Sequence, residues 1–296
     1  MRKLIAVAAL ALAAVACSDP VRVITPRAGG TEPTTSPPAS PSPSSAPATT
    51  QVTLYYLSSG ANEVFLVPER HRVAATPAIA RAALEELVHG QAQDPDHSTP
   101  FPDDSKINSV TISSGLATVD WSAEVLEASV GAEVESRGIQ SIVYTLTEFS
   151  SVQKVRFTVE GKTSGTASNG RAIEDFWGHV GLSDQPWDRD DPLDVLAPIT
   201  LWTPLQGTSS SGSLSLTGEG TTFEANVGIR LYDAAGKLVY QGHATAFPGP
   251  PERGEFSATI PFTAPSSPQT WTLAVTETSA MDGAVVYQET RTIRVG

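Results

Sequence analysis

Residues 106–121 read KINSVTISSGLATVDW, and apolar and polar residues alternate on both sides of Ser113-Ser-Gly115. Alternation with a period of two is typical of strands that bury one face, and a central glycine supplies the positive φ of a tight turn. The stretch therefore predicts a β-hairpin over 106–112 and 116–121. The residues expected to face the core are Val110, Ile112, Ala117, Val119 and Trp121.

The sequence around this hairpin predicts an α+β domain over residues 51–165. Upstream, 52–57, 64–67 and 70–74 have strand composition, and Thr76-Pro77 opens a helix that Gly90 ends. Downstream, Ile139, Ile142, Val143, Leu146 and Phe149 form one helical stripe before a strand over 152–159. Strands, helix, hairpin, helix and strand in that order favour an antiparallel sheet with helices on one face.

The C-terminal part, residues 198–296, predicts an all-β immunoglobulin-like sandwich. Strand-like runs recur about every 10 residues between turns, which is the spacing of such sandwiches. Trp271 is expected in the core. The seven runs are 199–203, 213–217, 225–232, 238–244, 254–262, 269–278 and 285–295.

The N-terminus predicts a lipoprotein signal peptide over residues 1–16. Arg2 and Lys3 precede an apolar run, 4–15, that is too short to cross a bilayer as a helix. The run ends in Ala14-Val15-Ala16-Cys17, which resembles the recognition site of lipoprotein signal peptidase, with Ala14 where leucine is usual. This resemblance implies lipidation of Cys17 and anchoring to the extracytoplasmic face of the cell membrane.

Two segments predict connections rather than domains. Residues 17–50 hold a Pro/Ser/Thr-rich tract without apolar periodicity, which favours an extended, disordered stalk. Residues 166–197 read as an acidic connector whose Ile173, Phe176, Trp177 and Val180 predict a short amphipathic helix. Five aspartates follow, but they lack the spacing of a calcium-binding loop, so we interpret them as solvated.

Short stretches in the first domain resemble the GerMN (sporulation and spore germination) domain of bacterial envelope proteins. They are 87–90 (LVHG), 119–122 (VDWS), 140–149 (QSIVYTLTEF) and 155–161. The C-terminal part resembles the immunoglobulin-like domain of bacterial spore germination, the Gmad family, at 204–207, 217–218, 230–237, 254–256 and 281–283. The resemblance implies an envelope protein and supplies no catalytic residues.

Composition and spacing give little support for catalysis. The net charge is −13, which disfavours nucleic-acid binding. His71, His89 and His97 have no spacing typical of a metal site, and neither a catalytic triad nor a phosphate loop is recognisable. We therefore expect no enzyme, no metal and no cofactor. The long polar loop 91–105 is expected to be exposed and is the candidate interaction loop, through His97, Phe101, Asp103 and Asp104.

These features predict a non-catalytic scaffold or binding protein of the bacterial envelope. Its partners would be the membrane, through the lipid on Cys17, and envelope proteins. One alternative is binding of cell-wall glycan or peptide. A second is a wall-polymer hydrolase that uses Asp94, Asp96, Asp103 and Asp104.

Overall fold

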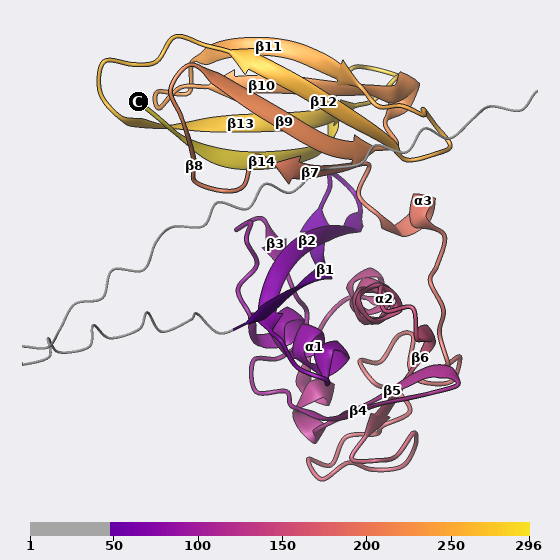
Figure 1. The fold of residues 1–296 in the computed structure, drawn as a ribbon. Coiled ribbons are helices and arrows are strands. Elements are labelled where there is room, and N and C mark those ends of the chain that lie inside the picture. Colours follow the sequence, from indigo (N-terminus) through magenta and orange to yellow (C-terminus); the bar gives the residue numbers. More distant parts are fainter. Residues whose placement is uncertain (1–47) are drawn as a thin grey trace, which may run out of the picture. The chain divides into compact units, whose positions relative to one another are not determined.

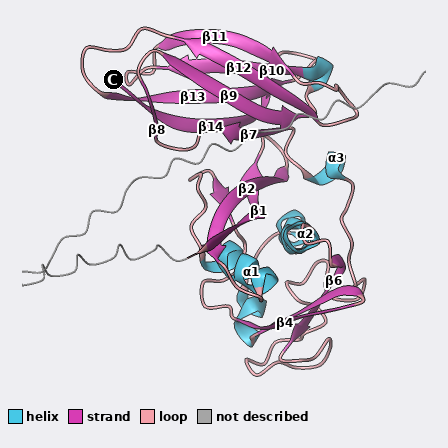
Figure 2. Cartoon of the chain, in the orientation of Figure 1, coloured by secondary structure: helices cyan, strands magenta, loops and turns pink. Residues whose placement is uncertain are grey.

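The structure, a computed structural model, describes residues 48–296. The predicted signal peptide 1–16, the lipidation site Cys17 and residues 17–47 of the predicted stalk lie outside the described residues. Within them the chain forms a domain of mixed helices and strands, followed by a β-sandwich (Figures 1 and 2). The predicted α+β class of the first and the all-β class of the second are confirmed.

The first sheet of the α+β domain is built on a long hairpin. β1 (Thr49–Ser59) and β2 (Val64–Ala74) pair antiparallel, and β3 (His97–Ser98) pairs with the other side of β1. The sequence predicted two strands over 64–67 and 70–74, but Pro68 lies inside one continuous strand, opposite Tyr55. Because β2 is at the edge of this sheet, the missing N–H of Pro68 deprives no neighbouring strand of a donor.

The second sheet contains the predicted hairpin. β4 (Ile107–Ser113) and β5 (Gly115–Trp121) pair antiparallel through a turn in which Ser114 and Gly115 both have positive φ. β6 (Val152–Val159) pairs with β5 in parallel, so the expectation of one antiparallel sheet is wrong. The connection between β5 and β6 is long enough to include a helix, and such a crossover permits parallel pairing.

The helices lie between these two sheets (Figure 1). α1 (Ile79–His89) contacts β1, β2 and β4, whereas α2 (Ala132–Thr147) contacts β1, β2 and β6. A 3-10 helix over Ala123–Glu127 follows β5. Four residues of the predicted apolar stripe, Ile139, Ile142, Val143 and Leu146, are buried on α2, whereas Phe149 lies beyond its end and is partly buried. Among residues 48–296, no helix combines the length and apolarity needed to cross a membrane.

The connector after β6 packs into the first domain without forming the predicted helix. Residues 173–180 form turns, because Phe176 and Gly178 take positive φ and break helical geometry. Ile173, Phe176 and Trp177 nevertheless belong to the buried core, and the Trp177 indole N–H donates to the carbonyl of Val125 at 2.7 Å. The one helix of the connector is the four-residue α3 (Pro192–Val195), capped by the carboxylate of Asp191.

The second domain is a sandwich of two sheets, with strand orders β11-β10-β13-β14-β8 and β12-β9-β7. All seven predicted strands are present, and Trp271 is buried in the core between the sheets as predicted. The short strand β8 was not predicted; it pairs in parallel with β14. The strands are β7 (Ile199–Thr203), β8 (Thr208–Ser210), β9 (Ser213–Gly220), β10 (Asn226–Tyr232), β11 (Leu238–Thr245), β12 (Gly254–Pro261), β13 (Gln269–Thr278) and β14 (Val285–Val295).

Candidate functional site

The predicted interaction loop, residues 91–105, is only partly exposed. Asp103 and Asp104 are exposed. Phe101, by contrast, is 4 % exposed and stacks on Trp121, and the His97 side chain is fully buried. The expectation that His97 and Phe101 face solvent is therefore wrong: Phe101 completes the core, and His97 enters a buried network of charges.

Glu69 is the centre of this network. Its carboxylate accepts hydrogen bonds from the backbone N–H groups of Gln93 and Asp94, at 2.7 and 3.0 Å. It also contacts His71 Nε2 at 2.7 Å and His97 Nδ1 at 2.6 Å. Burial would raise the pKa of Glu69, but the bonds from His71, His97 and Gln93 outweigh it and lower the pKa to about 2. Glu69 is therefore a carboxylate that organises two histidines.

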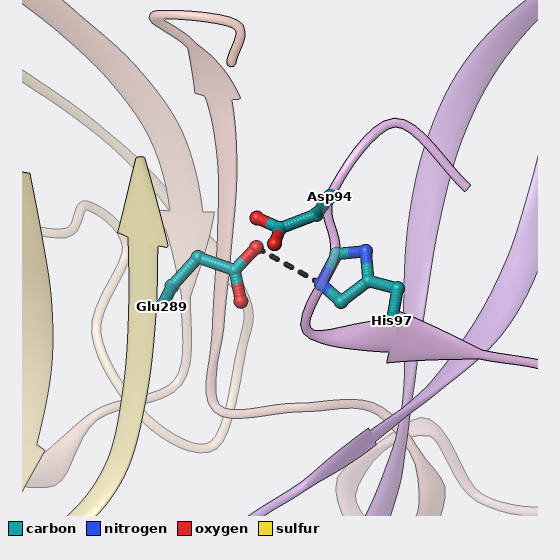
Figure 3. A group of neighbouring side chains, drawn as sticks. All are labelled: Asp94, His97 and Glu289. Atoms are coloured by element: carbon teal, nitrogen blue, oxygen red, sulfur yellow. Dashed lines mark ion pairs between the residues drawn. The ribbon is translucent and has the colours of Figure 1, made fainter. Parts of the chain in front are cut away.

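His97 connects the two domains. Its Nε2 lies 3.2 Å from a carboxylate oxygen of Glu289, which belongs to β14 of the sandwich (Figure 3). Burial lowers the pKa of His97, but its interactions with Glu289 and Glu69 raise it to about 9. His97 is thus an imidazolium at neutral pH, placed between one carboxylate from each domain.

Arg291, two residues after Glu289 on β14, adds the second bridge. Its guanidinium pairs with Asp94 of the first domain and lies 2.9 Å from Glu289. It also donates to the carbonyls of Thr290 and Leu201. Asp94, Glu289 and Arg291 are all buried, so this is a desolvated bridge in which breaking one pair leaves another charge uncompensated.

Asp94, His97 and Glu289 could each offer one atom to a metal ion, because these atoms lie within 4.8 Å of one another (Figure 3). However, Arg291 already pairs with Asp94 and Glu289, and each ring nitrogen of the His97 imidazolium faces a carboxylate, Nδ1 that of Glu69 and Nε2 that of Glu289. A divalent cation would have to displace the guanidinium and deprotonate the imidazole. The group therefore fits an ion-pair network better than a metal site.

Other contacts along the same seam join the domains. The Tyr287 hydroxyl of β14 donates to Glu289 of the same strand at 2.9 Å, which leaves its oxygen to accept from the Ser58 hydroxyl of the first domain at 3.3 Å, and Thr290 donates to Asp96 at 2.7 Å. Val67 of β2 belongs to the core cluster of the sandwich. The two domains of residues 48–296 are thus packed together through both charged and apolar contacts.

The sequence analysis did not single out Glu69, Glu289 or Arg291. The sequence did contain a sign that these charges are buried. The alternation in β2 places Glu69 on the same face as Val67 and Val73. The alternation in β14 places Glu289 and Arg291 on the same face as Ile293. All of these residues are buried. Charged residues at inward positions of a strand indicate buried pairs, but they do not identify their partners.

The four aspartates of the hydrolase alternative do not form one exposed cluster. Asp94 is buried and paired with Arg291, and Asp96 is an exposed residue bonded to Thr290. Asp103 and Asp104 are exposed. The geometry therefore gives this alternative no support.

Comparison with known families assigns both domains. Residues 53–165 match the family described as sporulation and spore germination (Germane), and residues 199–284 match the immunoglobulin-like domain of bacterial spore germination (Gmad2). The chain carries a Germane domain followed by a Gmad2 domain. Neither family description names a reaction.

Solved structures similar to the Germane–Gmad2 chain include the tandem GerMN domains of the sporulation protein GerM from Bacillus subtilis. Identity is 28 %, the TM-score is 0.38, and the match covers 48 % of this chain and 46 % of that one, so it spans about half of the tandem protein. The first GerMN domain of GerM alone is 26 % identical, with a TM-score of 0.37, covering 48 % of this chain and all of that one.

A further similar structure is a putative lipoprotein from Clostridium perfringens. It is 18 % identical, with a TM-score of 0.33, and the match covers 47 % of this chain and 87 % of that one. No curated protein matches the Germane–Gmad2 chain significantly.

The charge network predicts a pH-dependent stability. The folded pKa of His97, about 9, lies above its ordinary value of 6.5, so its contribution is complete below about pH 6.5 and is lost as pH rises through about 9. The pKa of His71 is also raised. Glu69 contributes above about pH 4.5, and this contribution is lost as pH falls through about 2.

We therefore expect the full-length chain to be most stable between about pH 4.5 and 6.5. Its free energy of unfolding should fall toward pH 9, by at most about 1.4 kcal/mol per pH unit for each histidine. Urea unfolding at several pH values measures this. His97→Gln should flatten the alkaline decline, whereas His243→Gln, at an exposed site on β11, should not. An unchanged decline in His97→Gln would contradict the assignment.

Proposed function

We propose that this chain is a lipid-anchored, non-catalytic scaffold or binding protein of the bacterial envelope. The sequence supports the anchor, because a short apolar leader ends in a solitary cysteine, Cys17. The families of both domains are associated with spore germination, which supports a place in an envelope assembly. Whether the host forms spores is separate from this proposal.

The observation that carries the binding role is the seam between the domains. Acidic and basic side chains are engaged with one another across it, as in His97–Glu289 and Arg291–Asp94. Such a network holds the surfaces of the two domains in a fixed orientation. This lowers the entropic cost of binding a partner that contacts both domains. The exposed end of the loop, Asp103 and Asp104, is the proposed protein contact.

Photo-crosslinking in intact cells tests this proposal. A photoreactive residue at position 104 is expected to capture an envelope protein reproducibly, whereas one at exposed Asp282, in a loop of the second domain, is the matched control. The Cys17→Ser variant should leave the membrane fraction and lose the same product. Absence of any product from position 104, or membrane retention of Cys17→Ser, would contradict the respective part of the proposal.

A second candidate function is binding of cell-wall glycan. It is favoured by a cleft beside the seam that combines an indole with two arginines, Arg70 and Arg72. Aromatic faces bind the apolar faces of ring-shaped ligands, and arginine binds anions.

A further inference from the structure

A cleft of about 280 Å³ lies between the two domains, beside the charge network. Glu69, Asp94 and Arg291 of the network contribute to its lining. Arg70 and Arg72 of β2 line it from the Germane domain, and Trp202 of β7 lines it from the Gmad2 domain. Clefts between domains are common positions for ligand sites, and the fixed charges give this one a pre-organised lining.

The strand register places the two arginines together. Arg70 and Arg72 are two positions apart on β2, so they project from the same face of the sheet, opposite to the buried His71 between them. Their partners on β1 are Thr53 and Gln51, and Gln51 also lines the cleft. This face of the hairpin therefore presents two exposed guanidinium groups beside neutral polar side chains.

Trp202 is the aromatic wall of the cleft. It is partly exposed, and the Arg70 guanidinium lies over its ring at 4.2 Å from the centroid. An arginine stacked in this way keeps its N–H groups at the edge of the guanidinium, where they can bind a carboxylate in a bidentate manner. A neighbouring cleft of about 580 Å³ shares Arg70 and Trp202 and adds Phe247, which is 81 % exposed.

The charges that remain available in the cleft are positive. Glu69 is engaged by two histidines, and Asp94 is engaged by Arg291. Within residues 48–296, the arginines in ion pairs are Arg81, Arg189, Arg253 and Arg291, so Arg70 and Arg72 are not neutralised there. In a chain of net charge −13 this is a local reversal of sign, which favours an anionic group at this position.

We propose that the cleft binds a saccharide that carries a carboxylate. The carboxylate would lie between Arg70 and Arg72, and an apolar face of the sugar ring would pack on the part of Trp202 that the Arg70 guanidinium leaves exposed. The arginines alone would bind any anion, and the indole alone would bind any flat apolar surface. Only the two together specify an acidic saccharide. This inference rests on the glycan-binding candidate above and specifies its ligand.

Isothermal titration of the full-length chain with N-acetylmuramic acid and with N-acetylglucosamine tests the proposal. The two sugars share the ring and acetamido group, and the first adds a lactyl carboxylate. N-acetylmuramic acid is expected to bind at least about tenfold more tightly. Arg70→Gln and Arg72→Gln should each weaken its binding about tenfold or more, while Arg294→Gln, an exposed arginine on β14, should leave it unchanged.

Three results would overturn the proposal. They are equal affinity for the two sugars, equal affinity for free lactate and N-acetylmuramic acid, and no heat of binding up to about 10 mM sugar. A thermal unfolding scan of each variant separates loss of the site from loss of the fold. Because titration uses purified protein, a negative result here leaves the crosslinking test of the scaffold role untouched, and the reverse also holds.

Discussion

Arg291→Ala is expected to lower the free energy of unfolding of the full-length chain by about 3–5 kcal/mol. The substitution removes the cation that bridges Asp94 and Glu289, and leaves both carboxylates in a buried seam. The magnitude reflects the cost of an uncompensated buried charge rather than the value of the bridge itself. Urea unfolding at pH 6, followed by tryptophan fluorescence, measures the change.

The form of the transition should also change. If the seam couples the domains, the wild type should unfold in one transition, whereas Arg291→Ala should separate into two as the domains lose their coupling. Arg294→Ala is the matched control, because Arg294 is an exposed arginine on the same strand. A loss below about 1 kcal/mol in Arg291→Ala, the range of exposed ion pairs, would show that water reaches the network.

Trp121→Ala is expected to destabilise the Germane domain by about 3–5 kcal/mol. Trp121 ends β5 and is fully buried. Its ring stacks on Phe101 at 5.2 Å between centroids and meets the edge of Phe157 at 5.9 Å. Removal of the indole would leave a cavity between the second sheet and the loop that carries Phe101.

Trp121→Phe separates the contribution of packing from that of the indole N–H. Among the described residues this N–H has no hydrogen-bond partner, so phenylalanine keeps an aromatic ring and removes a buried unsatisfied donor. We expect a loss of less than about 2 kcal/mol for Trp121→Phe in the same urea measurement. Similar losses in the alanine and phenylalanine variants would instead indicate that a single six-membered ring does not replace the packing of the whole indole at this position.

Local patterns predicted most of the fold. The 106–121 hairpin and the strands of the sandwich were predictable from the alternation of apolar and polar residues in each segment. Of the five expected core residues of the hairpin, however, only Ala117, Val119 and Trp121 of β5 are buried, whereas Val110 of β4 is partly buried and Ile112 is 40 % exposed. The connector was not, since the spacing of Ile173, Phe176 and Trp177 mimics a helical stripe although the chain turns at Phe176 and Gly178. The parallel pairing of β5 with β6 depends on strand order, which periodicity does not contain.

The candidate site was less predictable than the fold. His97 was singled out as an exposed interaction residue, but its role depends on Glu69 and Glu289, which lie far from it in sequence. A histidine in a polar loop gives no sign that it will be enclosed by a second domain. Pairing across such distances can be recognised only when the strands that carry the partners are placed side by side.

The long separation between the partners has a consequence for how the protein is made. Asp94 and Arg291 are 197 positions apart, and the Tyr287–Ser58 contact spans 229. During synthesis, the Germane domain emerges with the buried Asp94 still lacking its cation, Arg291, and β14 is made only after every other strand of the sandwich. The N-terminal domain is therefore completed only when the C-terminal strand is in place, so any chain cut short before β14 has an unfinished first domain that is more exposed to proteolysis.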